Sequence, residues 1–138
     1  MFLLDTNIVS ELRKSKPHGG VLSWMRSIPN ESLYISAVTI GEIQTGIEIT
    51  KEQDPLKAAI LESWLNLIAE NYKVLPMDSK IFRIWAKLMH RQTNTVVQDA
   101  MIAATALEHK LTVVTRNEKD FKRFKLSILN PFKSESTL

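Results

Sequence analysis

The sequence contains no cysteine among its 138 residues. This absence excludes disulfide scaffolds, cysteine nucleophiles, thiolate zinc sites and cysteine-ligated iron–sulfur clusters. Glycine and proline are sparse, at 4 and 5 residues, which excludes collagen-like and low-complexity chains. Hydrophobic residues make up 44% of the chain and charged residues 24%, a balance typical of a globular protein.

Long apolar segments are absent as well. The longest nearly apolar run, Ala100–Leu107, is far too short to span a bilayer. The first residues carry no basic stretch before an apolar one, so we expect no signal peptide, a cytoplasmic location and no membrane partner. The formal net charge of +3, with a pI near 9.2, permits an anionic partner such as nucleic acid without requiring one.

Strand and helix patterns alternate along a chain whose length fits one domain. Short apolar runs bounded by polar or turn residues predict strands at 2–4, 33–35, 74–75, 111–114 and 127–129. Helical spacing and capping residues predict helices at 6–12, 21–28, 37–50, 55–68, 79–89 and 97–109, with a helical turn at 118–124. The alternation predicts a single doubly wound α/β/α domain at 1–131 with a mainly parallel central sheet, followed by a polar C-terminal tail at 132–138.

Several polar residues lie where a parallel sheet forms its sites, beyond the carboxyl ends of the strands and near the point where the topology reverses. The candidates follow a strand or lie early in a helix: Asp5, Glu42, Asp99, Thr115, Asn117 and Asp120. Asp99 is the most informative, because a carboxylate opening an apolar, buried helix costs several kcal/mol unless it is paired or bound to a metal.

Each acid also has a simpler interpretation. Asp99 and Asp5 could be N-caps of the helices beside them. Glu42 could be a solvated side chain beside a packing notch formed by Gly41 and Gly46, and Asp120 could be an ordinary surface acid. The joint placement of the acids is more specific than any one of them.

Clustered carboxylates without cysteine or suitably spaced histidine predict a hard cation, Mg²⁺, for which Mn²⁺ can substitute. Magnesium held by few carboxylates commonly acts on phosphates. Basic residues follow the fourth predicted strand, and a basic rim beside an acidic centre suits a polyanion, with Arg116 and Lys119 as candidate contacts. A second basic series, at 80–91, is more simply a solvated helix face.

With these residues in place, the chain resembles PIN-domain ribonucleases, and specifically the VapC-type toxins of bacterial toxin–antitoxin pairs. The matching segments are Leu3–Asn7, Ser36–Glu42, Asp99–Ala106, Thr115–Asn117 and Asp120–Phe121. They occur in the family's order and at about its spacing, and they cover almost the whole chain up to Pro131. The resemblance implies a PIN-like fold and a Mg²⁺-dependent endoribonuclease.

The resemblance also implies roles for individual residues. Asp5, Glu42 and Asp99 match the main acidic positions, which are catalytic and hold the metal. Asp120 matches a more variable catalytic position, and Asn117 stands where some members carry a further acid. Thr6 and Thr115 match polar positions that support the site. Lys110 stands where glycine is usual.

The implied reaction is hydrolysis of an RNA phosphodiester by a metal-activated water, with the departing oxygen leaving as a 3′-hydroxyl. The implied partners are the RNA substrate, a second copy of the chain in a homodimer, and a small cognate antitoxin that often places an arginine near the acidic centre. Operator DNA is bound only through the toxin–antitoxin complex.

Two other functions stay open at this point. A phosphatase would use Asp5 as a nucleophile, but that chemistry commonly needs a second acid at the position held here by Asn7. A catalytically silent module would only bind RNA or an antitoxin.

Overall fold

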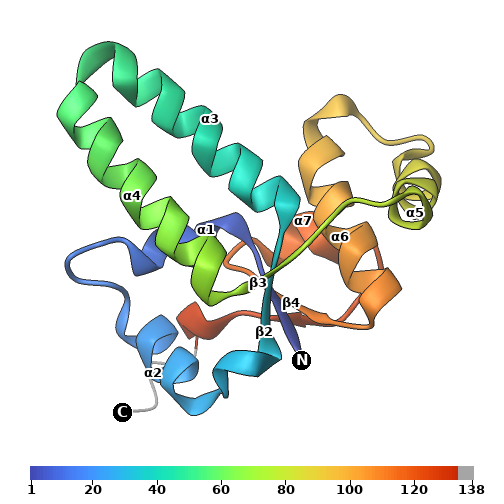
Figure 1. Cartoon of the computed structure of the whole chain (residues 1–138). Helices are drawn as coiled ribbons and strands as arrows, with labels where there is room; N and C mark the ends of the chain where they lie inside the picture. The colour runs from blue at the N-terminus through green and yellow to red at the C-terminus, as the bar shows by residue number, and fades with distance from the viewer. Residues whose placement is uncertain (134–138) are drawn as a thin grey trace.

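Five strands form one sheet in the computed structural model, which describes residues Met1–Lys133 (Figure 1). The strands are β1 (Phe2–Leu4), β2 (Leu33–Ser36), β3 (Lys73–Leu75), β4 (Thr112–Val114) and β5 (Ile128–Leu129). They lie in the order β3-β2-β1-β4-β5, and every neighbouring pair is parallel. The predicted α/β fold with a parallel central sheet is confirmed.

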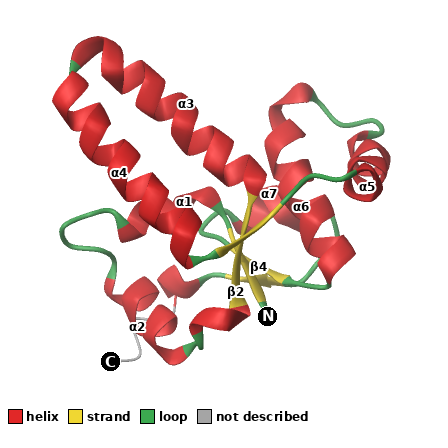
Figure 2. Ribbon diagram, viewed as in Figure 1, coloured by secondary structure: helices red, strands yellow, loops and turns green. Residues whose placement is uncertain are grey.

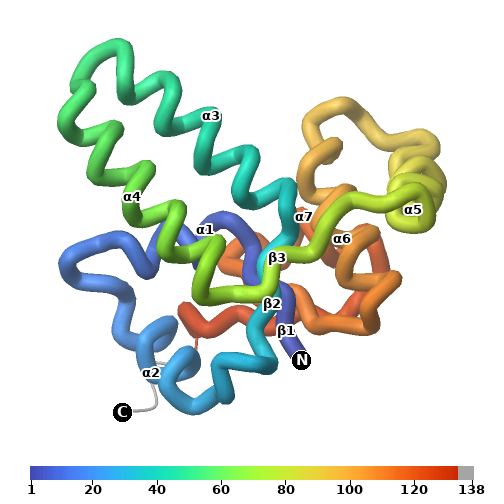
Figure 3. Tube along the Cα trace, viewed as in Figure 1, coloured from blue at the N-terminus to red at the C-terminus, as the bar shows by residue number. Residues whose placement is uncertain are grey.

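Helices surround the sheet on both faces, as Figure 2 shows in red around the yellow strands. They are α1 (Thr6–Leu12), α2 (Gly19–Ser27), α3 (Ala37–Gln53), α4 (Pro55–Asn71), α5 (Ser79–Met89), α6 (Val97–His109) and α7 (Glu118–Lys122). Three short 3₁₀ turns accompany them: η1 (Asn30–Ser32), η2 (Asn94–Val96) and η3 (Pro131–Lys133). Helices α3 and α4 run side by side as a hairpin that projects away from the sheet (Figure 3).

Three helices begin at N-caps that make side-chain hydrogen bonds. Ser36 Oγ accepts from the Val38 amide at 3.1 Å at the start of α3. Asp54 Oδ1 accepts from the Lys57 amide at 3.1 Å, with proline at the first position of α4. Asp78 Oδ1 likewise accepts from the Ile81 amide at 2.9 Å in α5. These caps fix where the three helices begin.

The core lies on both faces of the sheet because side chains alternate along each strand. Leu3 packs with Ala103 and Phe121 on the face covered by α5, α6 and α7. Leu4 packs with Ile8 and Val21 on the face covered by α1 and α2. Burial on both faces explains why the strands appear as apolar runs rather than alternating patterns.

Two further expectations from the sequence concern membrane-spanning segments and the C-terminal tail. In the part that the structure describes, no helix combines the length and apolarity that a membrane crossing needs. The predicted tail at 132–138 falls mostly on residues 134–138, which lie outside the described residues. Phe132 packs against the α1–α2 side of the core, and Lys133 pairs with Glu118 at 2.6 Å.

Helix α6 ends at Lys110, which adopts the left-handed conformation with φ 56° and ψ 48°. The next amide, of Leu111, donates to the Ala106 carbonyl at 2.9 Å and closes the helix. A side chain in this conformation costs roughly 1 kcal/mol, which glycine avoids because it has no Cβ. We therefore expect Lys110→Gly to raise the free energy of unfolding by about 0.5–1 kcal/mol, measured by urea denaturation.

The matched control is Arg83→Gly, at an exposed residue in the interior of α5. It should lower stability by about 1 kcal/mol, because glycine is disfavoured in a helix interior. If both substitutions destabilise the protein alike, the conformation of Lys110 is not strained.

Candidate active site

The site lies where the sheet topology reverses. Strand β1 pairs with β2 on one side and β4 on the other, so the chain winds outward in both directions from this point. The last residues of β1 and β4, Leu4 and Val114, are partners in the register. The residues that follow them, Asp5 and Thr115, therefore meet at the carboxyl edge of the sheet, where open α/β sheets form their sites.

Asp5 is 5% exposed, and both oxygens of its carboxylate accept hydrogen bonds. Its Oδ1 accepts from the Thr6 amide at 2.8 Å, so Asp5 is the N-cap of α1, as the simpler interpretation predicted. Its Oδ2 accepts from Thr115 Oγ1 at 2.8 Å and from Asn7 Nδ2 at 3.1 Å. Because a carboxylate has about four lone-pair positions, one acceptor position on Oδ1 is left for a further partner.

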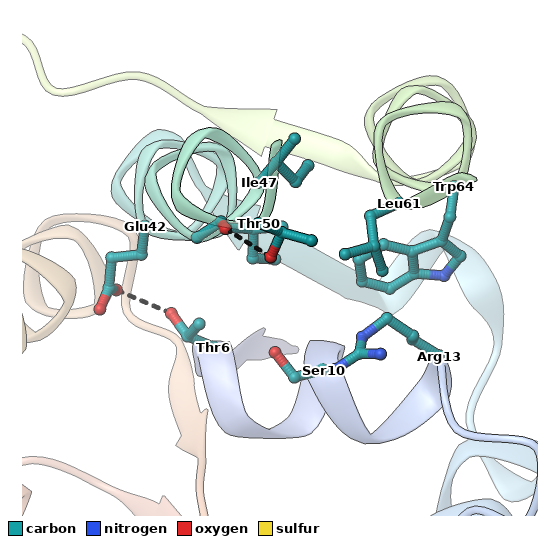
Figure 4. A pocket seen from close by; sticks show the side chains of 10 residues that line it. Thr6, Ser10, Arg13, Glu42, Ile47, Thr50, Leu61 and Trp64 are labelled. Carbon is teal, nitrogen blue, oxygen red and sulfur yellow. Dashed lines mark hydrogen bonds between the residues drawn. The ribbon is translucent and has the colours of Figure 1, made fainter. Parts of the chain in front are cut away.

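Glu42 is half-buried and held by α1 rather than free in solvent. Thr6 Oγ1 donates to Glu42 Oε1 at 2.7 Å, as Figure 4 shows. Thr39 Oγ1 lies 3.0 Å from Thr6 Oγ1 and must donate to it, since Thr6 has already given its only hydroxyl hydrogen to Glu42. The interpretation of Glu42 as an ordinary solvated residue is therefore wrong.

Asp99 lies in the first turn of α6 but does not cap it. The helix begins at Val97, and its N-cap is Val96, the last residue of the 3₁₀ turn η2. Among the described residues, the Asp99 side chain accepts no hydrogen bond and makes no ion pair within contact distance. The N-cap interpretation of Asp99 is therefore wrong, and its charge is left without a direct structural partner.

Three of these carboxylates, Asp5, Glu42 and Asp99, are costly to ionise in the folded chain. Burial raises the pKa of Asp99 from 3.8 to about 6, and the charges of Asp5, Asp120 and Glu42 add to the rise, against a smaller opposing effect of Arg123. Burial likewise raises the pKa of Asp5, with a contribution from Asp120, and that of Glu42, with one from Asp5. The structure therefore brings the four predicted acids, from four different segments, into one neighbourhood.

The chemistry of this donor set fits a hard divalent cation. Within Met1–Lys133, no three acidic or histidine side chains form a ready-made metal cluster. Magnesium, however, is commonly held by one or two carboxylates and keeps its remaining waters. The groups that could hold it are the free acceptor position of Asp5 Oδ1 and the Asp99 carboxylate, with Glu42 beside them. A cation there would offset both the burial and the repulsion that raise their pKa values.

Thr115 connects the predicted supporting residues. Its buried hydroxyl donates to Asp5 and accepts from the Asn117 amide at 3.0 Å, while Asn7 Nδ2 lies 3.3 Å away. Asn117 is thus held through its backbone, and its side chain lines a cavity together with Asp120.

Two residues that hold the site together were not among the sequence-based candidates. Thr39 orients Thr6 and lies three residues before Glu42, so helical spacing could have placed both on one face. In the sequence, Asn7 was considered only as part of the matching segment and as the position where a phosphatase would need a second acid. The structure instead has its amide nitrogen donate to Asp5 and its amide oxygen accept from the Arg116 backbone at 3.2 Å.

Comparison with known proteins identifies a matching family model, similar curated proteins and similar solved structures. The PIN domain family model matches residues 2–126. The chain is 33% identical to "Toxin FitB" of Neisseria gonorrhoeae, with 96% of this chain and 99% of that protein covered. It is 34% identical to "VapC ribonuclease Y4jK" of Sinorhizobium fredii, with 96% and 98% covered. Among solved structures, FitAcB from Neisseria gonorrhoeae matches with a TM-score of 0.85 and 31% identity, covering 96% of this chain and 99% of the other.

Proposed function

Because this chain belongs to the PIN domain family, we propose that it is a Mg²⁺-dependent endoribonuclease and the toxin of a toxin–antitoxin pair. The observation that carries the proposal is the convergence of Asp5, Glu42 and Asp99 beside Asp120 near the topological switch point, because burial and neighbouring charges make the first three acids costly to ionise without a cation. The relatives named as a toxin and as a ribonuclease support the same assignment.

Asp5 and Asp99 would hold the metal, with Glu42 as a further ligand. When bound, Mg²⁺ supplies charge neutralisation and an acidified water for hydrolysis of an RNA phosphodiester, with release of a 3′-hydroxyl. Mn²⁺ would substitute, because it also prefers carboxylate oxygens. Asp120 and Asn117, at the edge of the acidic centre, would orient the attacking water.

The chain's own hydrogen bonds would keep these carboxylates in position. Thr115 and Asn7 fix the Asp5 carboxylate from one side. Thr6 fixes Glu42 and ties α1 to α3. Positioned donors of this kind limit the reorganisation that the site needs during reaction.

The contacts of Asp5 disfavour the phosphatase alternative. The side chain is almost fully buried, and Oδ1 keeps only the one acceptor position that we assign to the metal, whereas a nucleophile needs an oxygen with access to the phosphorus. The silent binding module is disfavoured because no fold requirement accounts for several carboxylates with raised pKa values in one place.

A groove beside the acidic centre supports an antitoxin partner. Its volume is about 240 Å³, and it runs between α1 and the α3–α4 hairpin from Trp64 and Leu61 to Glu42 (Figure 4). Gly46 lines it, and apart from its two chain neighbours and the backbone of its own helix nothing lies within 4 Å of a Cβ added there, so the glycine leaves space for a second chain. An antitoxin segment would lie on the apolar end and bring a basic residue to Glu42. A homodimer, and operator DNA bound only through the antitoxin complex, are part of the same proposal.

The test is cleavage of a labelled RNA by the purified chain with and without divalent cation. We expect cleavage in Mg²⁺, loss of at least about a thousandfold in rate with EDTA, and recovery when Mg²⁺ or Mn²⁺ is returned. Adding a purified antitoxin encoded beside the gene should stop cleavage. Cleavage that continues unchanged in EDTA would show that the acidic centre does not act through a metal.

A further inference from the structure

A second cavity, of about 410 Å³, opens between the β4–α7 segment and η3. Its volume is within the range of pockets that bind ligands, about 300–1,000 Å³. We call it the basic pocket, because four cations line it against two acids; its lining is Arg116, Asn117, Glu118, Lys119, Asp120, Lys122, Asn130 and Lys133. Asp120 also raises the pKa values of Asp5 and Asp99, so the pocket adjoins the acidic centre.

The cations of the basic pocket are mostly uncommitted. Glu118 accepts from Lys133 Nζ at 2.6 Å and from Asn130 Nδ2 at 3.0 Å, so Lys133 and Glu118 neutralise each other. Within residues 1–133, Lys119 and Lys122 form no ion pair, and neither does Arg116. Their charges are available to an anionic ligand.

Arg116 is held in place on both its side chain and its backbone. Its guanidinium carbon lies 4.8 Å from the centre of the Phe132 ring, close enough for a cation–π contact. Its amide donates to Asn7 Oδ1 at 3.2 Å, and Asn7 Nδ2 donates to Asp5 Oδ2 at 3.1 Å. Two hydrogen bonds, relayed by the Asn7 side chain, therefore connect the backbone of Arg116 to the carboxylate at the proposed reaction centre.

We propose that the basic pocket binds the phosphate backbone of single-stranded RNA next to the cleaved bond. An acidic centre repels the backbone of its own substrate, so the strand needs cations immediately outside the centre. Lys119 and Lys122 would contact phosphates on the exposed side of α7, and Arg116 would fix the register of the strand relative to Asp5. This inference rests on the proposed nuclease function, because it assigns the path of that enzyme's substrate.

The test is binding of a fluorescently labelled single-stranded RNA in EDTA, measured by anisotropy on a protein carrying Asp99→Asn so that the RNA stays intact. Adding Lys119→Ala and Lys122→Ala should weaken binding about tenfold near 0.1 M salt. The slope of log affinity against log salt should fall in magnitude by about 1.4, since each single-strand phosphate contact contributes about 0.7.

The control removes the same charge elsewhere. Lys51→Ala with Lys57→Ala changes two exposed lysines at the far end of the α3–α4 hairpin (Figure 1), and we expect a change of less than about twofold. Three results would overturn the assignment of the basic pocket: an equal loss of RNA affinity in both double variants, no loss of RNA affinity in either, or no RNA binding at all.

The outcome separates this inference from the proposed function. If only the α7 pair, Lys119→Ala with Lys122→Ala, weakens RNA binding, and the unmodified chain does not cleave RNA in Mg²⁺, the basic pocket is supported and the nuclease function is rejected. If the unmodified chain cleaves RNA but the α7 pair weakens RNA binding no more than the control pair does, the nuclease function is supported and the basic pocket is rejected.

Discussion

Asp99→Asn is expected to lower Mg²⁺-dependent RNA cleavage by about a thousandfold or more, with the fold intact. The amide keeps the size of the side chain and removes the negative charge that the metal would require. Asp99 accepts no hydrogen bond from the described residues, so its replacement breaks no structural contact of the carboxylate. Single-turnover cleavage of a labelled RNA measures the loss, and circular dichroism checks the fold.

The matched control for this prediction is Glu108→Gln on the same helix. Glu108 is partly exposed and faces Lys80 at 3.7 Å, a surface pair of small value. Its replacement should leave cleavage within about twofold. Near-normal activity of Asp99→Asn would remove Asp99 from the reaction centre, and an equal loss from Glu108→Gln would point to a general effect on α6.

Local signals in the chain predicted where most elements lie but not which elements are neighbours. Apolar runs placed β1 and β4, and caps such as Ser36 and Asp54 placed the helix starts, because these signals act over a few residues. The order of the strands depends on long-range pairing, so the contact between Asp5 and Thr115 became visible only with the sheet.

The acidic positions were predictable, whereas their bonding was not. The N-cap interpretation of Asp99 failed because the turn η2 places the cap of α6 three residues earlier, at Val96. Phe132 was assigned to a polar tail on composition alone. It packs because α2 and His18 provide an apolar and aromatic surface for it, and this surface exists only in the folded chain.

The surroundings of Gly41 and Gly46 in α3 could not be predicted from the sequence. Two glycines in one helix suggested a packing notch within the chain, since each costs roughly 1 kcal/mol relative to alanine. In the folded chain, nothing outside the chain neighbours and the backbone of the helix itself lies within 4 Å of the position that a Cβ would take at either glycine. The space beside Gly46 belongs instead to the groove that we assign to an antitoxin.

The same Asp99→Asn substitution should make the metal-free protein more stable at neutral pH. A carboxyl whose pKa rises from 3.8 to about 6 on folding keeps its proton in the native state between these values, while the unfolded chain has lost it. Its contribution to stability is therefore complete below pH 3.8 and is lost as pH rises through 6. At pH 7 the charged side chain costs on the order of 1 to 2 kcal/mol, allowing for solvent screening at a half-buried group. The variant should remove that cost.

Urea denaturation in EDTA across pH 4 to pH 8 measures this effect. The unmodified chain should lose stability over that range, and the variant should lose less, with a remaining decline from the raised pKa values of Asp5 and Glu42. Added Mg²⁺ should stabilise the unmodified chain, by about 2.7 kcal/mol at a hundredfold excess over Kd, and the variant much less. If Asp99 instead stabilised the fold, the change in the free energy of unfolding would have the opposite sign, because Asp99→Asn would destabilise the protein at every pH. Greater stability together with lost cleavage would show that Asp99 is retained for a bound cation at the expense of the empty protein.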